Sequence, residues 1–216
     1  MARRGSSSRA RGGKDDQVGA APYVKRVLPF FDPLDMEQIE KLEQQVDWLI
    51  EDIGIAFRDD PASIALWKQH GATVDGDIVR ASADWIRDLC RKAPSQFTQL
   101  ARDPAKSVVI GGDSQVFAPI YGAPFVRDLE EGRRYGDIAA FRDLVRLTYM
   151  HPYLHHGGFV TCEPCDIPVS KRHLDMLLAH MTLSDKPHLG AITEMSRAQD
   201  SVDMAEIVFG RDVMDK

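Results

Sequence analysis

The stretch that decides the fold is residues 154–193, LHHGGFVTCEPCDIPVSKRHLDMLLAHMTLSDKPHLGAIT. Two short apolar stretches, 154–161 and 189–193, flank residues 169–183, where leucines and methionines recur at helical spacing. Apolar stretches without polar alternation are typical of strands buried on both faces, and such strands occur in parallel sheets with crossover helices. Residues 154–193 therefore predict a βαβ unit.

The helix–strand alternation continues on both sides of this unit. Upstream, Asp137 is expected to cap a helix that ends at His151-Pro152. Downstream, Ser196 is expected to cap another helix, with Gln199 completing a capping box. The pattern predicts α/β architecture for the second half of the chain.

The first half of the chain has a different pattern. Helices are expected after Asp35, after Asp60-Pro61 and after Ser82, because each supplies a cap before an amphipathic stripe. From residue 107 to Asp128, glycine-containing turns separate short apolar stretches, which predicts β-hairpins. The sequence thus predicts a helical N-terminal region, then hairpins, then βα units.

Periodicity alone leaves two architectures open for the βα units. A doubly wound open sheet and a (β/α)₈ barrel both alternate strands with helices. A barrel needs about 250 residues, more than the βα part of this chain provides. The chain is therefore expected to be either a compact half-sheet or an incomplete barrel.

Composition indicates a soluble protein of a reducing compartment. Hydrophobic residues make up 44% of the chain and charged residues 28%, which is typical of globular domains. No apolar run approaches the length of a membrane span, and the N-terminus lacks the apolar region of a signal peptide. Three cysteines are too few for a disulfide framework. We expect a cytoplasmic protein without a membrane partner.

The N-terminus differs from the rest of the chain in charge. Residues 1–14 contain arginine and lysine but no acid, although the net charge of the chain is −6. This Gly/Ser/Arg-rich stretch has little apolar surface to bury, so we expect it to be disordered. It could act as a solubilising tail, as a tether to nucleic acid or an anionic surface, or as a transit peptide. The acidic remainder argues against nucleic acid as the main partner.

Several strings, in this order and at these spacings, resemble the trimethylamine methyltransferase family from about residue 35 to the end of the chain. They are IGIAFRDDP (53–61), HGATVDG (70–76), KAPS (92–95), ARDP (101–104), IGGD (110–113), FAPIYGAP (117–124) and DLEEGRR (128–134).

The resemblance implies a fold and its division. Members of the family are (β/α)₈ TIM-type barrels behind a helical N-terminal region, and their chains are more than twice this length. Together with the composition of the N-terminus, it gives the expected division: a disordered basic tail and lead-in over 1–34, a helical region over 35–104, and β-hairpins with the first strands and helices of a truncated barrel over 105–216.

The resemblance also implies an activity. Family members move a methyl group from a methylated amine, such as trimethylamine or glycine betaine, to the cobalt of a corrinoid (cobalamin), in one-carbon metabolism that includes methanogenesis. The corrinoid is supplied by a partner protein, so no cofactor is bound directly. The founding members use pyrrolysine, at a position beyond residue 216, so the subgroup and the methylated amine are not determined.

Holding a quaternary ammonium needs aromatic faces and carboxylates, and barrels place such groups at the carboxyl ends of their strands. Three residues there are candidate substrate-binding groups. Tyr121 could face the ammonium or fill a hairpin contact. Glu163 could pair with the ammonium or lie in a solvated loop or helix cap. Glu194 could face the site or only favour the next helix N-terminus.

No catalytic residue or metal ligand is predicted. Cys162 and Cys165 have the spacing of half a zinc site or of a redox pair. Zinc needs further ligands, and His155 and His156 would point to opposite faces of a strand, so only one could join. The sequence also contains no phosphate-binding loop and no nucleophile elbow.

Two functions remain from the sequence. The first is an amine-to-corrinoid methyltransferase, expected to be a homo-oligomer. The second is a non-catalytic fragment or interaction module that needs a second polypeptide to complete the barrel, because a few parallel strands leave an unpaired edge.

Overall fold

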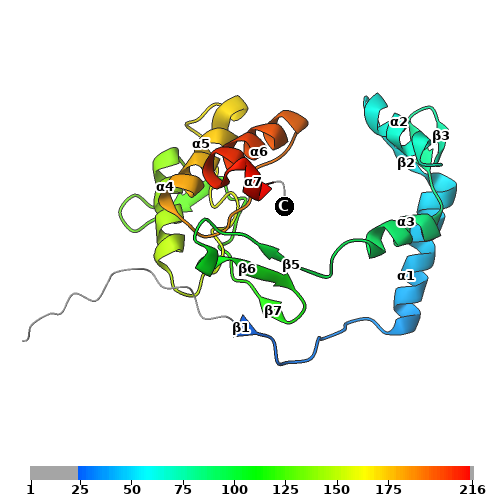
Figure 1. Cartoon of the computed structure of the whole chain (residues 1–216), viewed down its shortest axis with the longest axis horizontal. Helices are drawn as coiled ribbons and strands as arrows, with labels where there is room; N and C mark the ends of the chain where they lie inside the picture. Colours follow the sequence, from blue (N-terminus) through cyan, green and yellow to red (C-terminus); the bar gives the residue numbers. More distant parts are fainter. Residues whose placement is uncertain (1–23, 215–216) are drawn as a thin grey trace, which may run out of the picture. The chain divides into compact units, whose positions relative to one another are not determined.

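The computed structural model describes residues 24–214, which form two compact units (Figure 1). One unit is Arg26–Ser95, and the other combines residues 24–25 with 96–214. The expected disorder of the basic tail concerns residues outside the described part of the chain. The division at residues 34 and 104 remains a prediction for the whole protein. No helix within residues 24–214 is long and apolar enough to cross a membrane.

In the unit Arg26–Ser95, helices begin at caps that the sequence predicts. Asp35 and Gln38 form a complete capping box at the start of α1. Asp60 accepts the Ser63 backbone N–H at the start of α2, which confirms that cap. Its elements are α1 (Met36–Trp48), continued by a π-helical turn (Leu49–Ile53), α2 (Pro61–Gln69), α3 (Ala83–Arg91) and a three-stranded antiparallel sheet of β2 (Ile55–Ala56), β4 (Ile78–Arg80) and β3 (Thr73–Asp75).

The second unit begins with short antiparallel strand pairs. The first is β5 (Gln96–Gln99) with β6 (Val108–Gly111), linked by a 3₁₀ turn (Pro104–Lys106). The others are β1 (Val24–Lys25) with β7 (Ser114–Gln115), and β8 (Phe125–Arg127) with β9 (Arg133–Tyr135). Of the predicted hairpins, β8 and β9 pair across the turn that contains Glu131 and Gly132, as expected. The other predicted pairing is wrong: β6 pairs with β5, which precedes the predicted hairpin range, and residues 116–123 form no strand.

Helices α4, α5 and α6 follow and lie side by side (Figure 1). Their bounds, with the short α7, are Ile138–Met150, Val169–Leu183, Met195–Phe209 and Arg211–Met214. Asp137 caps α4 as predicted, accepting the Ala140 N–H. The predicted cap at Ser196 is wrong. Glu194 holds the extended N-cap conformation, so Ser196 lies inside the first turn of α6.

Three segments without regular strand structure precede α4, link α4 to α5 and link α5 to α6, respectively. We call residues 117–123 segment A, residues 155–163 segment B and residues 187–193 segment C. Segment B is joined to A by four backbone hydrogen bonds: from the His155 and His156 N–H groups to Phe117 O (3.0 and 3.2 Å), from Gly122 N–H to Val160 O (2.8 Å) and from Glu163 N–H to Ala123 O (2.9 Å). It is joined to C by two: from Gly157 N–H to Pro187 O (2.7 Å) and from Leu189 N–H to Gly158 O (3.0 Å). Along the hydrogen bonds between A and B, and along those between B and C, the residue numbers of the two partners rise together. The three segments therefore run parallel.

The predicted regular strands at 154–161 and 189–193 are nevertheless wrong, because neither stretch forms a strand. Gly158 has φ +83°, and its position against Pro119 leaves no room for a Cβ, which would lie 2.5 Å from the ring. Pro187 has no N–H to donate. These residues interrupt the hydrogen-bond pattern, while α4 and α5 still cross between successive parallel segments. The described residues form a mixed α/β fold with small antiparallel sheets and no closed barrel.

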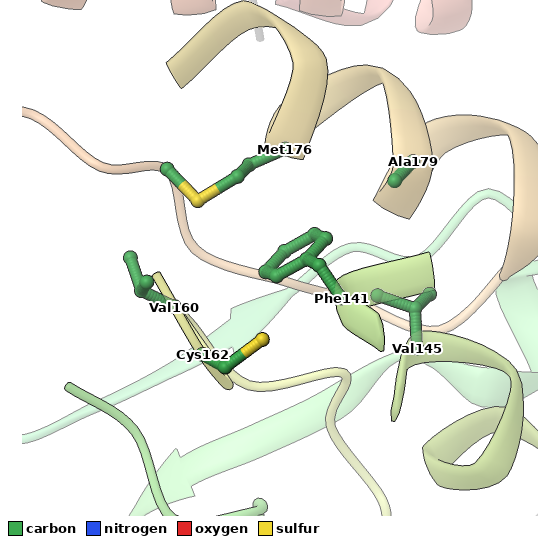
Figure 2. Close-up of a cluster of buried hydrophobic side chains, with 6 residues drawn as sticks. All are labelled: Phe141, Val145, Val160, Cys162, Met176 and Ala179. Atoms are coloured by element: carbon green, nitrogen blue, oxygen red, sulfur yellow. The ribbon is translucent and has the colours of Figure 1, made fainter. Parts of the chain in front are cut away.

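The core of this unit lies between segment B and two helices (Figure 2). Phe141 and Val145 of α4 meet Met176 and Ala179 of α5, and Val160 and Cys162 face Phe141 from segment B. Burying a side chain of the size of phenylalanine contributes about 1.5–3 kcal/mol. This packing fixes the carboxyl end of segment B beside the first turns of α5.

Candidate functional site

A cavity of about 210 Å³ lies where segments B and C end, against the first turns of α5 and α6. Apolar side chains and several charged or polar ones share its wall. The lining residues are Phe159, Val160, Glu163, Val169, Arg172, His173, Met176, Ala191, Thr193 and Arg197.

Glu163 is on the cavity wall and is paired. Its Oε2 accepts a hydrogen bond from Arg172 Nη1 at 3.0 Å, and the side chains are 35% and 18% exposed. Arg172 also donates to the Ile167 carbonyl from Nε and Nη2, at 3.2 and 3.0 Å. The loop carbonyl therefore fixes the guanidinium, which holds the carboxylate of Glu163 at the end of segment B.

Glu194 reaches the cavity through a neighbour. It is the N-cap residue of α6, but its side chain makes no cap hydrogen bond. Its Oε1 instead accepts from Arg197 Nε at 3.1 Å, with 60% of the Glu194 side chain and 16% of the Arg197 side chain exposed. Arg197 Nη2 also donates to the Val169 carbonyl at 3.3 Å. Arg197, rather than Glu194, lines the cavity.

Tyr121 also contacts a lining residue. It is exposed at the end of segment A, and its ring lies edge-on to Phe159, with centroids 5.6 Å apart. The structure thus gathers the three predicted site residues around one cavity. Glu163 lines it directly, while Tyr121 and Glu194 contact residues that do.

The sequence analysis did not identify His173 as a candidate site residue. His173 is buried, lines the cavity, and places Nε2 2.7 Å from Asp200 Oδ2 on α6. Its Nδ1 is buried without a hydrogen-bond partner. The signal for this pair was the βα alternation, because successive crossover helices lie side by side on a parallel sheet.

The cysteine pair does not offer two reactive thiols. Cys162 lies in the core, where burial, followed by the negative charge of Asp137, raises the pKa of its thiol to about 11. Cys165 is exposed. A buried neutral thiol is a poor zinc ligand and reacts slowly in thiol–disulfide exchange. Within residues 24–214, no three His, Cys, Asp or Glu side chains gather in a group that could hold a metal ion.

A second cluster of histidines lies at the opposite ends of the segments. His156 and His188 lie near the starts of segments B and C, and His180 is on α5. The His180 and His188 rings are stacked, with centroids 5.1 Å apart. Burial, and then the charge of His188, lowers the pKa of both His156 and His180 to about 4. His156 Nε2 lies 3.1 Å from Gln99 Oε1. These imidazoles are neutral core groups at neutral pH.

The second unit therefore has a cavity with apolar and charged walls at the carboxyl ends of segments B and C, and α/β enzymes bind small molecules at the corresponding ends of their parallel strands. The family model described as trimethylamine methyltransferase (MTTB) matches residues 2–216. The chain belongs to the trimethylamine methyltransferase family, which confirms the resemblance found in the sequence.

Two curated relatives are similar to this chain over most of its length. A glycine betaine methyltransferase of Desulfitobacterium hafniense (strain Y51) is 36% identical over 185 residues, covering 86% of this chain and 38% of the relative. A proline betaine:corrinoid methyltransferase of Eubacterium limosum is 23% identical over 195 residues, covering 86% of this chain and 39% of the relative. The chain thus spans less than two-fifths of the length of these relatives.

Proposed function

We propose that the protein takes part in moving a methyl group from a methylated amine, such as trimethylamine or glycine betaine, to the cobalt of a corrinoid carried by a partner protein. The observation that carries the proposal is the cavity at the ends of segments B and C, in a chain of this family. An aromatic face and a carboxylate meet at its wall, and these are the groups that hold a quaternary ammonium.

The proposal includes a (β/α)₈ barrel in which segments A, B and C are the first three parallel strands. Their common direction and the helices that cross between them support this. Leu189 and Ile192 of segment C are both about half exposed, and exposed apolar side chains next to a sheet edge suit a further strand. We also propose a cytoplasmic homo-oligomer that binds no cofactor directly.

The roles of the residues follow from charge. Bound at the site, a reduced corrinoid would supply the nucleophile that accepts the methyl group. Tyr121 and Phe159 would offer aromatic faces to the ammonium, and Glu163 would balance its charge while Arg172 keeps the carboxylate in place. Glu194 would act through Arg197. Because the amine leaves neutral, the chain need not donate a proton to it.

The test is an assay of the full gene product with a panel of methylated amines and reduced cobalamin, following methylcobalamin by its absorbance. We expect methylcobalamin with at least one tertiary or quaternary amine, and a rate at least tenfold lower for Glu163→Gln. Absence of methylcobalamin with every amine would contradict the proposed function.

A further inference from the structure

The cavity at the ends of segments B and C carries more fixed positive than negative charge on its wall. Arg172 and Arg197 both line it, and Glu163 is its one lining carboxylate. Both guanidiniums are less than one-fifth exposed, so water screens them weakly. A negatively charged group of a ligand would offset the excess positive charge of this wall.

The two arginines differ in how firmly they are already paired. Arg172 is held by Glu163 and by two hydrogen bonds to Ile167 O. Arg197 pairs with Glu194, whose side chain is 60% exposed. Because most of the Glu194 side chain is exposed, water can solvate its carboxylate when a ligand carboxylate takes its place on Arg197. Arginine is also well suited to grip a carboxylate through two parallel N–H groups.

His173 adds a group that responds to such a ligand. Asp200 faces its Nε2, while its Nδ1 is buried without a partner. A buried polar atom without a partner costs about 1–3 kcal/mol. A ligand that brings a polar group to Nδ1 would supply the missing partner and remove this cost.

We propose that this cavity is a binding site for a small carboxylate, with Arg197 as its principal contact and Glu194 as the competing internal carboxylate. A volume of about 210 Å³ suits a ligand smaller than a drug-sized molecule. The identity of the ligand rests on the proposed function: if that function holds, the carboxylate belongs to a betaine. The shared chemistry also admits a free carboxylate such as acetate.

Equilibrium binding to the full gene product, without corrinoid, tests the site. Titration calorimetry is carried out with glycine betaine, which carries both groups, with acetate, which carries only the carboxylate, and with tetramethylammonium, which carries only the ammonium. We expect glycine betaine, acetate or both to bind, and Arg197→Met to weaken that binding at least tenfold. Arg146→Met is the control, because Arg146 also pairs with a carboxylate three residues earlier, Asp143 on α4, and does not line the cavity.

Binding of tetramethylammonium alone, binding of none of the three, or carboxylate binding that survives Arg197→Met would overturn the proposal. Circular dichroism melts verify that each variant is folded. If Arg197→Met does not fold, the Glu194 variant below decides.

Glu194→Gln gives a change of opposite sign. Removing the competing carboxylate should tighten glycine betaine or acetate binding about threefold, which corresponds to the modest strength of an exposed ion pair. If Glu194 instead held the ammonium of the ligand, the same substitution would weaken glycine betaine binding and contradict the proposal. Carboxylate binding with the expected variant effects but no methyl transfer would reject the proposed function and leave this site in place.

Discussion

The two ends of the parallel segments differ in what their polar groups do. At the amino ends, His156 and His180 are buried, and the half-buried His188 stacks on His180. At the carboxyl ends, charged side chains surround a cavity, and their partners are partly exposed. In βα structures one end of the strands serves stability and the other serves binding. Substitutions at the two ends should therefore separate stability from ligand binding.

The largest expected effect is on the core between the two ends. Phe141 is fully buried against Met176 and Cys162, so Phe141→Ala should lower the free energy of unfolding by about 3–5 kcal/mol. Urea denaturation measures this. Tyr153→Ala, at an exposed aromatic side chain, is the control. A loss below about 1 kcal/mol for Phe141→Ala would show that this cluster is not the core.

The histidine cluster predicts a pH dependence of stability. The pKa values of His156 and His180 are lowered to about 4 from an ordinary 6.5, so on acidification the unfolded chain binds protons first. Stability is complete above about pH 6.5 and is lost as the pH falls towards 4. For one histidine the loss between pH 7.5 and 5 is about 2 kcal/mol.

Urea unfolding at both pH values measures this loss. His156→Asn should reduce the dependence, because asparagine does not titrate and its oxygen can still accept the Gly158 N–H. His70→Asn, at an exposed histidine on the other unit, should leave it unchanged. Equal slopes for the protein and His156→Asn would contradict the role of this cluster.

The close approach of segments A and B gives a smaller effect. Gly158→Ala places a methyl group 2.5 Å from Pro119 at φ +83°, whereas Gly132→Ala, at φ +69°, meets nothing within 4 Å. Both substitutions incur backbone strain, and only the first also forces a clash. Thermal denaturation should show Gly158→Ala to be less stable than Gly132→Ala by about 1–2 kcal/mol. Similar stabilities would argue against this packing.

The sequence predicted the local structure better than the pairing of segments. The caps at Asp35, Asp60 and Asp137 depend on hydrogen bonds to residues three positions on, so a short motif determines them. The regular strands were predicted wrongly because apolar runs do not reveal that Gly158 must pack against Pro119.

In the candidate site, too, the sequence identified a residue marked by a local pattern and missed features that depend on distant residues. Glu163 was identified because it follows an apolar stretch, and it lines the cavity. The partner of His173 is 27 residues away on the next helix, and nothing local indicates it. The neutral state of Cys162 was also missed, because its thiol lies against Phe141 across the core rather than beside a neighbour in sequence.

The most direct test measures stability and activity together in Glu163→Gln. The account predicts a methyl-transfer rate at least tenfold lower and a free energy of unfolding lower by no more than about 1 kcal/mol, since the pair with Arg172 is partly exposed. A loss of several kcal/mol in stability with the rate per folded molecule unchanged would contradict it, because Glu163 would then belong to the framework rather than to the site.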